Sequence, residues 1–218
     1  MASDVLVFDD YSSVADLANF ISRAKAIEED GALLVARGTA LAVYVPVLVP
    51  AELGDGGYTV LGMRVHRLAG PAEANQAYSL SALQDRLARM QPDGVQLAVP
   101  PVEEHPAWAG ISVPVSGWSE AGSISSQVLR QAAQDGIDAV AQALPENPGK
   151  PVIAQIRQRI WSSPLPEAGL ELPLGAAFAM HALGFLGQGH CKVFTQGQWT
   201  RVSSTTGHVV LRRQSLLG

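Results

Sequence analysis

The sequence has few of the features that point directly to a chemistry or a location. It holds one cysteine, Cys191, so no disulfide can form within the chain. Its five histidines, at positions 66, 105, 181, 190 and 208, are scattered and show no metal-ligand spacing. We therefore expect neither a bound metal nor a cofactor.

The sequence also has no apolar run of the roughly 18 to 20 residues that a membrane-spanning helix needs. Its N-terminus, MASDVLVFDD, has no basic segment followed by an apolar one, as a secretory signal would. Motifs of nucleotide-binding loops, serine hydrolases and zinc peptidases are missing too. These absences predict a soluble, cytoplasmic protein without membrane contact. They do not favour an enzymatic activity, but they do not exclude one.

What the sequence does have is the composition of an ordinary globular protein, with 47% hydrophobic and 16% charged residues among 218. The net charge of −5 is unevenly distributed. Residues 150–218 carry seven Lys and Arg against two Asp and Glu, and residues 1–149 carry eight against 18. This asymmetry indicates an anionic partner for the basic part or attraction between the two parts.

Hydrophobic periodicity predicts an α+β fold whose N-terminal half, residues 1–95, contains an antiparallel sheet with helices. An amphipathic helix is followed by three β-rich runs, a hairpin and a third strand, and by a second helix; the segments are 12–31, 32–37, 40–50, 58–70 and 79–90. Pro46 removes a ladder donor, which indicates that its strand is bent or lies at an edge.

The C-terminal half, residues 123–218, is predicted to contain three helices and a three-stranded β-meander. The helices lie at 123–144, 151–163 and 173–187, and the strands lie within 190–213. A crossing segment rich in Pro and Trp, residues 96–122, separates the two halves. We expect either two domains or one compact unit.

Three helices before a β-hairpin is the order of a winged-helix domain, which reads DNA with the helix before the wing. Here that helix is PLGAAFAMHALGFL, in which His181 is the only polar side chain. A helix that is hydrophobic around its circumference is buried. We therefore expect a winged-helix-like order without a recognition helix. We also expect Phe178, Leu183, Phe185 and Leu186 to be mostly buried.

The C-terminal strands predict a basic and aromatic surface. If Gln196 and Gly197 form a two-residue turn, Lys192 lies opposite Arg201. If residues 204–207 form the next turn, Trp199 lies opposite Arg212. Alternation along the strands then places seven side chains on one face: Lys192, Phe194, Trp199, Arg201, Ser203, His208 and Arg212.

Like charges in register destabilise a bare sheet, so this face should have a compensating partner. An anionic ligand, a nucleic acid or an acidic protein surface would supply one, bound by Lys192, Phe194, Trp199, Arg201, His208 and Arg212. The alternative is internal compensation, with Arg212 over Trp199 in a cation–π pair. A further alternative is that another part of the protein, or a second copy in a homo-oligomer, covers the face.

A second candidate site combines the loop VEEHPAW with nearby polar residues in a pocket between the halves. Its members are Arg64, His66, Glu103, Glu104, His105, Trp108 and Trp118. Paired carboxyl groups beside a histidine suit general acid–base work. Adjacent charges in a proline-rich loop are also what a solvated surface contains.

Several segments resemble an uncharacterised family of proteins from actinobacteria: HPAWAGISVP, GAAFAMHALGFLG, GQWTRVSSTTGHVVLRR and DGALLVARGTALAVYV. The excess of arginine over lysine, 12 against 3, is typical of a GC-rich genome. The resemblance implies a soluble cytoplasmic protein without an assigned activity, and it supplies no functional residues.

These observations favour a non-enzymatic binding or regulatory protein that uses the basic, aromatic face of the meander for an anionic ligand or partner. The alternative is an enzyme of unknown reaction with a pocket near residues 103–118.

Overall fold

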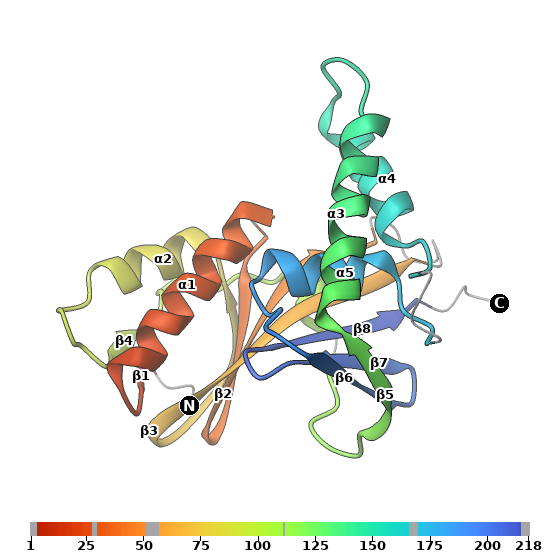
Figure 1. Cartoon of the computed structure of the whole chain (residues 1–218). Helices are drawn as coiled ribbons and strands as arrows, with labels where there is room; N and C mark the ends of the chain where they lie inside the picture. Colours follow the sequence, from red (N-terminus) through yellow and green to blue (C-terminus); the bar gives the residue numbers. More distant parts are fainter. Residues whose placement is uncertain (1–3, 28–29, 51–56, 111, 166–169, 215–218) are drawn as a thin grey trace. The chain divides into compact units, whose positions relative to one another are not determined.

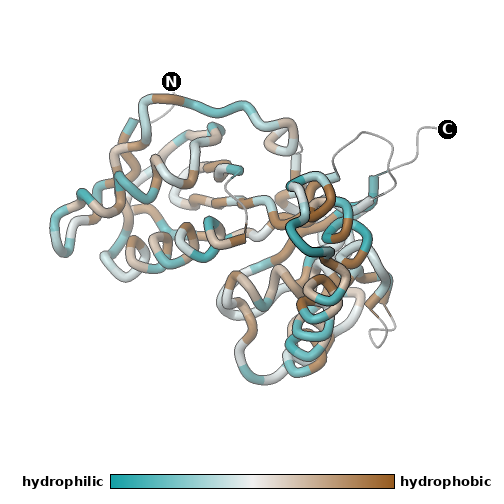
Figure 2. The backbone as a smooth tube through the Cα atoms, turned by 90° about the horizontal axis from the view of Figure 1, so that it is seen from above, coloured by the Kyte–Doolittle hydropathy of each residue, from teal (hydrophilic) through white to brown (hydrophobic). Residues whose placement is uncertain are grey.

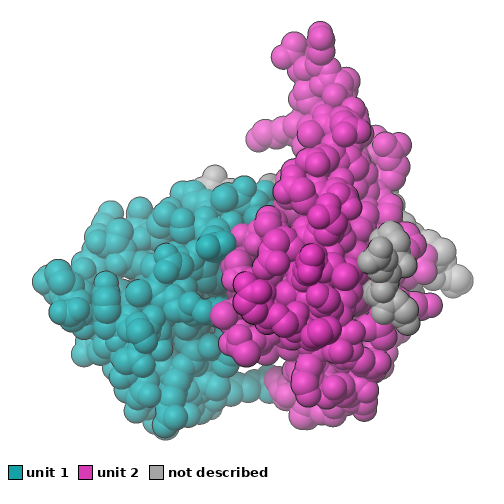
Figure 3. Space-filling view, in the orientation of Figure 1, with its two compact units in different colours: residues 1–46, 63–112 teal, residues 47–62, 113–218 magenta. Residues whose placement is uncertain are grey.

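A computed structural model describes residues 4–27, 30–50, 57–110, 112–165 and 170–214. In these ranges the chain forms eight strands, five α-helices and one short 3-10 helix (Figure 1). The residues fall into two compact units (Figure 3). Unit 1 comprises residues 1–46 and 63–112, and unit 2 comprises residues 47–62 and 113–218.

Unit 1 combines two helices with most of a long β-hairpin. The helices α1 (Tyr11–Ile27) and α2 (Leu80–Ala88) lie side by side (Figure 1). The hairpin consists of β2 (Ala32–Leu48) and β3 (Tyr58–Tyr78), whose ends next to the connecting loop belong to unit 2. Two short strands, β1 (Val5–Val7) and β4 (Gln96–Ala98), pair antiparallel, and the 3-10 helix η1 covers Ala107–Gly110.

The predicted helix α1 is confirmed, and its burial follows from its sequence. Buried apolar residues recur every three or four positions: Val14, Leu17, Phe20, Ile21 and Ala24. Hydrophilic and hydrophobic residues alternate along the helices in Figure 2. After α1, Gly31 has φ +86°, and a Cβ there would lie 3.0 Å from the carbonyl oxygen of Tyr78. Glycine is therefore required where the chain turns into β2.

The first two β-rich runs form one strand, β2, instead of the predicted hairpin. Gly38 lies between them with φ +58°. A Cβ built there would have no described atom within 4 Å. Because glycine tolerates this left-handed conformation, the strand continues through the position where a turn was predicted. Pro46 lies in β2, which is an edge strand of its sheet, so the prediction of an edge position is confirmed.

Unit 2 contains the remaining helices and strands. The helices are α3 (Ser126–Ala143), α4 (Lys150–Trp161) and α5 (Leu174–Ala182), all at predicted positions. The strands are β5 (Ser119–Ser125), β6 (His190–Gln196), β7 (Trp199–Ser203) and β8 (His208–Arg213). Strand β5 was not predicted, because its sequence SEAGSIS contains a single β-branched residue and no clear alternation of apolar and polar residues.

Six strands form one sheet in the order β2-β3-β8-β7-β6-β5. The predicted winged-helix-like half is therefore wrong. The meander of β6, β7 and β8 is not a free wing, because β5 pairs with β6 on one side and β3 adjoins β8 on the other. The order of helices and strands along the chain could not reveal this, since it does not specify which strands pair.

The register of the meander is partly as predicted. The β7–β8 register is confirmed, including the pair of Trp199 and Arg212. The β6–β7 register is wrong by two residues, because the turn is formed by residues 197 and 198 and Phe194 lies opposite Arg201. Lys192 lies opposite Ser203 instead of opposite Arg201. An even shift leaves each side chain on its predicted face.

The apolar face of the meander is the core of unit 2, and α5 lies against β8. Its residues are at most 1% exposed: Cys191, Val193, Val202, Val209 and Leu211. Beyond α5, Leu183 and Phe185 are buried, as predicted. Phe178 and Leu186 are of intermediate exposure, so they are less completely buried than Leu183 and Phe185. Phe178 stacks on Trp161, with ring centroids 4.4 Å apart.

Candidate functional site

The predicted basic and aromatic face of the meander forms, but its two arginines contact aromatic rings of the same unit. The guanidinium carbon of Arg201 lies 4.6 Å from the ring centroid of Trp118 and 4.7 Å from that of Phe194. Arg212 lies over Trp199 at 5.5 Å. These are the distances of cation–π pairs, so the internal compensation considered for Arg212 is present.

The other polar residues of this face also have partners within unit 2. Lys192 Nζ lies 3.0 Å from Glu120 Oε2, with both side chains more than half exposed. His208 Nδ1 lies 2.9 Å from Ser203 Oγ. Trp199 is only 7% exposed, which leaves little of its ring for stacking on a ligand. The opposition of Lys192 and Arg201, which motivated a bound anion, does not occur.

The residues of the second predicted site are divided between the units, with Trp118 in unit 2 and the others in unit 1. Trp118 Nε1 donates to the carbonyl oxygen of Pro114 at 3.0 Å. In unit 1, Glu103, Glu104 and His105 are exposed, whereas Trp108 is buried. The loop is tied to β3 through its backbone, since the Glu104 amide donates to the Ala77 carbonyl oxygen at 2.7 Å.

Arg64 and His66 of β3 meet Asp16 of α1, a residue that the sequence analysis did not select. The Arg64 guanidinium pairs with both carboxylate oxygens of Asp16, with Nε 2.5 Å from Oδ2. His66 Nδ1 lies 3.7 Å from the same Oδ2, and its ring meets Phe8 edge-on at 5.8 Å between centroids. The spacing of α1 and β3 in the sequence gives no signal for this cluster.

Burial governs the charge of His66, whose side chain is 2% exposed. Desolvation lowers its pKa from 6.5 to about 4; Asp16 opposes this shift and Arg64 adds to it. The imidazole is therefore neutral near pH 7. With the Arg64–Asp16 pair beside it, this cluster fastens α1 to β3.

The regular elements of the chain are basic, although the whole chain has a net charge of −5. The described helices and strands carry 14 Lys and Arg against six Asp and Glu, a net charge of +8. Several strand cations are held by aromatic rings or carboxylates, as described above. On the helices, Arg23, Lys150 and Arg159 are exposed.

In unit 1 the helical cations are Arg23, Lys25, Arg86 and Arg89, the last at the C-cap of α2. Arg23 and Arg89 are exposed, and Lys25 Nζ donates to Gln84 Oε1 at 3.2 Å, which links α1 to α2. In unit 2, α4 carries Lys150, Arg157 and Arg159 and no acidic residue. Sequence reasoning missed these residues because charges on the exposed face of an amphipathic helix are normal.

Two further classes of site are absent from the described ranges. None of the helices there has both the length and the apolar character needed to cross a membrane. The same ranges bring together no group of three or more His, Cys, Asp and Glu side chains suited to a metal ion.

The fold is similar to that of bacterial DNA polymerase III beta subunits. A putative beta subunit from Eubacterium rectale matches with a TM-score of 0.57 and 9% identity, covering 97% of this chain and 64% of that chain. The sliding clamp from Caulobacter crescentus matches with a TM-score of 0.53 and 14% identity, covering 99% and 66%. The beta subunit from Pseudomonas aeruginosa matches with a TM-score of 0.52 and 12% identity, covering 97% and 65%. The chain thus spans just under two thirds of the length of these proteins.

This likeness corrects both the predicted fold and the predicted function. The fold is the α+β fold of sliding clamps, with a six-stranded sheet, and not a winged-helix-like arrangement. The fold therefore does not support the predicted regulator that binds an anion on the meander. It does not support the alternative, an enzyme with a pocket between two halves, either.

Family models match the two parts of the chain separately, whereas no curated protein matches it. Residues 113–216 match the domain of unknown function DUF8185, and residues 1–110 match the domain of unknown function DUF8010. Neither description includes a source, so the expected actinobacterial origin gains no support from them. The DUF8010 model matches half of the chain, which shows that the chain belongs to the DUF8010 family.

Proposed function

We propose that the protein is a sliding-clamp-like protein that associates with DNA. The observation that supports this most is the fold likeness to DNA polymerase III beta subunits over 97% to 99% of the chain. Self-association is part of the proposal.

The helical cations would supply the contacts with DNA. Duplex DNA carries about one negative charge per 1.7 Å of its axis, and proteins that bind it without sequence preference do so largely through Lys and Arg on phosphates. Arg23 and Arg89 in unit 1, and Lys150 and Arg159 in unit 2, are exposed. Phosphate contacts carry no sequence information, which suits a protein that moves along DNA.

This function would place the protein in the cytoplasm, where bacterial DNA is found. DNA is the proposed anionic partner, and other proteins of DNA metabolism are the proposed protein partners.

The proposal is tested by measuring the affinity for a short fluorescent DNA duplex over a range of salt concentrations. We expect binding that weakens steeply with salt, and Arg23→Ala and Arg89→Ala should each lower the slope of log K against log salt by about one. Arg37→Ala, which removes an exposed cation from β2, is the matched control and should leave the slope unchanged. Absence of salt-dependent binding, or an equal effect of all three substitutions, would contradict the proposal.

A further inference from the structure

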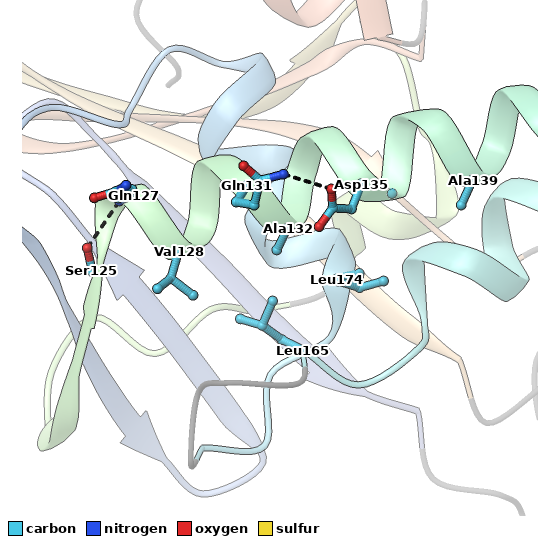
Figure 4. Close-up of a pocket in the computed structure, with 10 residues that line it drawn as sticks. Ser125, Gln127, Val128, Gln131, Ala132, Asp135, Ala139, Leu165 and Leu174 are labelled. Atoms are coloured by element: carbon cyan, nitrogen blue, oxygen red, sulfur yellow. Dashed lines mark hydrogen bonds between the residues drawn. The ribbon is translucent and has the colours of Figure 1, made fainter.

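Two pockets of different chemistry lie beside the first turns of α3. One, with a volume of about 420 Å³, is mainly apolar and is lined by Val128, Ala132, Leu165 and Leu174 (Figure 4). The carboxylate at its rim, Asp135, accepts a hydrogen bond from Gln131 at 2.8 Å. None of the described residues that line this pocket is a cation.

The other pocket is polar and has a volume of about 780 Å³. It is lined by α3, by α5, by the start of β6 and by the glycine-containing segment 187–189. Three of its side chains are basic, Arg130, His181 and His190, and no Asp or Glu is among the described residues that line it. We propose that this polar pocket binds a phosphate group.

Arg130 is oriented by the backbone of the segment that it faces. Its Nη2 donates to the carbonyl oxygens of Leu186 and Gly187 at 3.3 and 3.4 Å. A guanidinium has five N–H donors, and these two contacts use one nitrogen. The remaining donors are available for the oxygens of a phosphate, which Arg binds with good geometry.

The two histidines reach the pocket from different elements. His190 is the first residue of β6 and is exposed, whereas the next residue, Cys191, points into the core. His181 is the polar side chain of the otherwise apolar α5. The sequence predicted a core position for it, but the structure leaves it partly exposed on the pocket wall. Imidazoles donate hydrogen bonds to phosphate oxygens and add positive charge when protonated.

The two carboxylates of α3 form hydrogen bonds with glutamine side chains of the same helix. Asp135 and Asp138 accept hydrogen bonds from the side-chain amides of Gln131 and Gln134 at 2.8 and 3.0 Å, and neither lines the polar pocket. The described lining of the polar pocket therefore has basic side chains and no carboxylate, unlike that of its apolar neighbour, which includes Asp135.

The volume fits a phosphorylated small molecule such as a nucleotide, since small-molecule sites measure about 300 to 1,000 Å³. A phosphodiester of the DNA backbone presents similar oxygens. Phosphate binding in this pocket does not depend on the proposed association with DNA, because the pocket can bind a free phosphate when no DNA is present.

The test is calorimetric titration of the full chain with inorganic phosphate. We expect Arg130→Ala to weaken binding about tenfold, because it removes the guanidinium charge and its donors. His181→Gln and His190→Gln should weaken it about threefold each, because each replaces an imidazole that can carry positive charge by a neutral amide. Arg130→Lys should retain part of the affinity. His105→Gln and Arg37→Ala, in unit 1, are controls that should change nothing. His190 is exposed, so its variant should fold even where the others are impaired.

Competition then identifies the source of the phosphate. Displacement by a nucleoside monophosphate, but not by a blunt duplex without terminal phosphates, supports the proposal with a free ligand. Displacement by the duplex supports it with the DNA backbone. No binding of phosphate, or binding that is unchanged in the Arg130 and His190 variants, overturns it. Arg23→Ala should weaken DNA binding without affecting phosphate, so the two proposals fail separately.

Discussion

At the scale of single residues, His66 links the stability of unit 1 to pH. Its pKa is about 4 in the folded protein and 6.5 as the ordinary value, because burial disfavours the charged form. Between these values the unfolded chain binds more protons than the folded one, so stability rises with pH across this window. The contribution of the neutral, buried His66 to the free energy of unfolding is fully present above pH 6.5 and is lost as the pH falls toward 4.

We predict that this titration removes about 3 kcal/mol of the free energy of unfolding between pH 6.5 and pH 4. Denaturant unfolding at a series of pH values measures it. His66→Gln should flatten this part of the profile, whereas His105→Gln, which changes an exposed histidine, should retain it. A wild-type profile that is flat in this window would show that burial does not depress the His66 pKa.

A second residue-scale prediction concerns Gly136, which is buried in the middle of α3. Replacing a glycine at an exposed helix position by alanine stabilises a protein by about 1 kcal/mol. Here a Cβ would lie 2.7 Å from Trp161 Cη2 and would overlap Cζ3, and Trp161 is itself buried. We expect Gly136→Ala to destabilise the protein by about 1 to 2 kcal/mol, measured by thermal unfolding. Gln134→Ala, on the exposed side of α3, should change stability by less than about 0.5 kcal/mol.

At the scale of elements, the polar face of the meander is held together by stacking more than by its exposed ion pair. Arg201 lies between the rings of Trp118 and Phe194, at 4.6 and 4.7 Å, whereas the pair of Lys192 and Glu120 is largely exposed. Desolvated cation–π contacts are stronger than exposed salt bridges.

We therefore predict that Arg201→Ala costs about 1 to 2 kcal/mol of stability and Lys192→Ala less than about 0.5 kcal/mol. Chemical denaturation of the two variants under the same conditions gives the comparison. Equal losses, or a larger loss for Lys192→Ala, would mean that the exposed pair and not the stack holds β6 to its neighbours.

At the scale of the whole molecule, the family boundary and the structural units do not coincide. The two family models divide the chain between residues 110 and 113, but residues 47–62 belong to the same unit as residues 113–218. The contact is specific, since β3 adjoins β8 and the Gln214 amide donates to the Gly57 carbonyl oxygen at 2.8 Å just beyond the two strands. A fragment cut at the family boundary therefore loses the neighbour of β8.

We predict that residues 113–218 produced alone aggregate or unfold, because the exposed edge of β8 pairs with other chains. Co-production with residues 1–112 should restore solubility, which gel filtration and circular dichroism would record. If the fragment alone is monomeric and unfolds cooperatively, residues 47–62 are dispensable for this unit.

The sequence by itself determined the features that depend on local periodicity. The spacing of Val14, Leu17 and Ile21 located α1, and the apolar circumference of α5 predicted its burial. Alternation in the meander sorted its side chains correctly between two faces. This held despite the wrong β6–β7 register, because a shift of two residues keeps every side chain on its side of the sheet.

Only the tertiary structure decided the features that depend on segments distant in the sequence. These are the continuity of β2 through Gly38, the pairing of β5 with β6, and the place of the meander in a six-stranded sheet. The cluster of Asp16 and His66 and the pocket of Arg130 and His190 arise in the same way. Strand pairing and side-chain convergence are fixed by the energy of packing the whole chain, and no local pattern records which distant segments will meet.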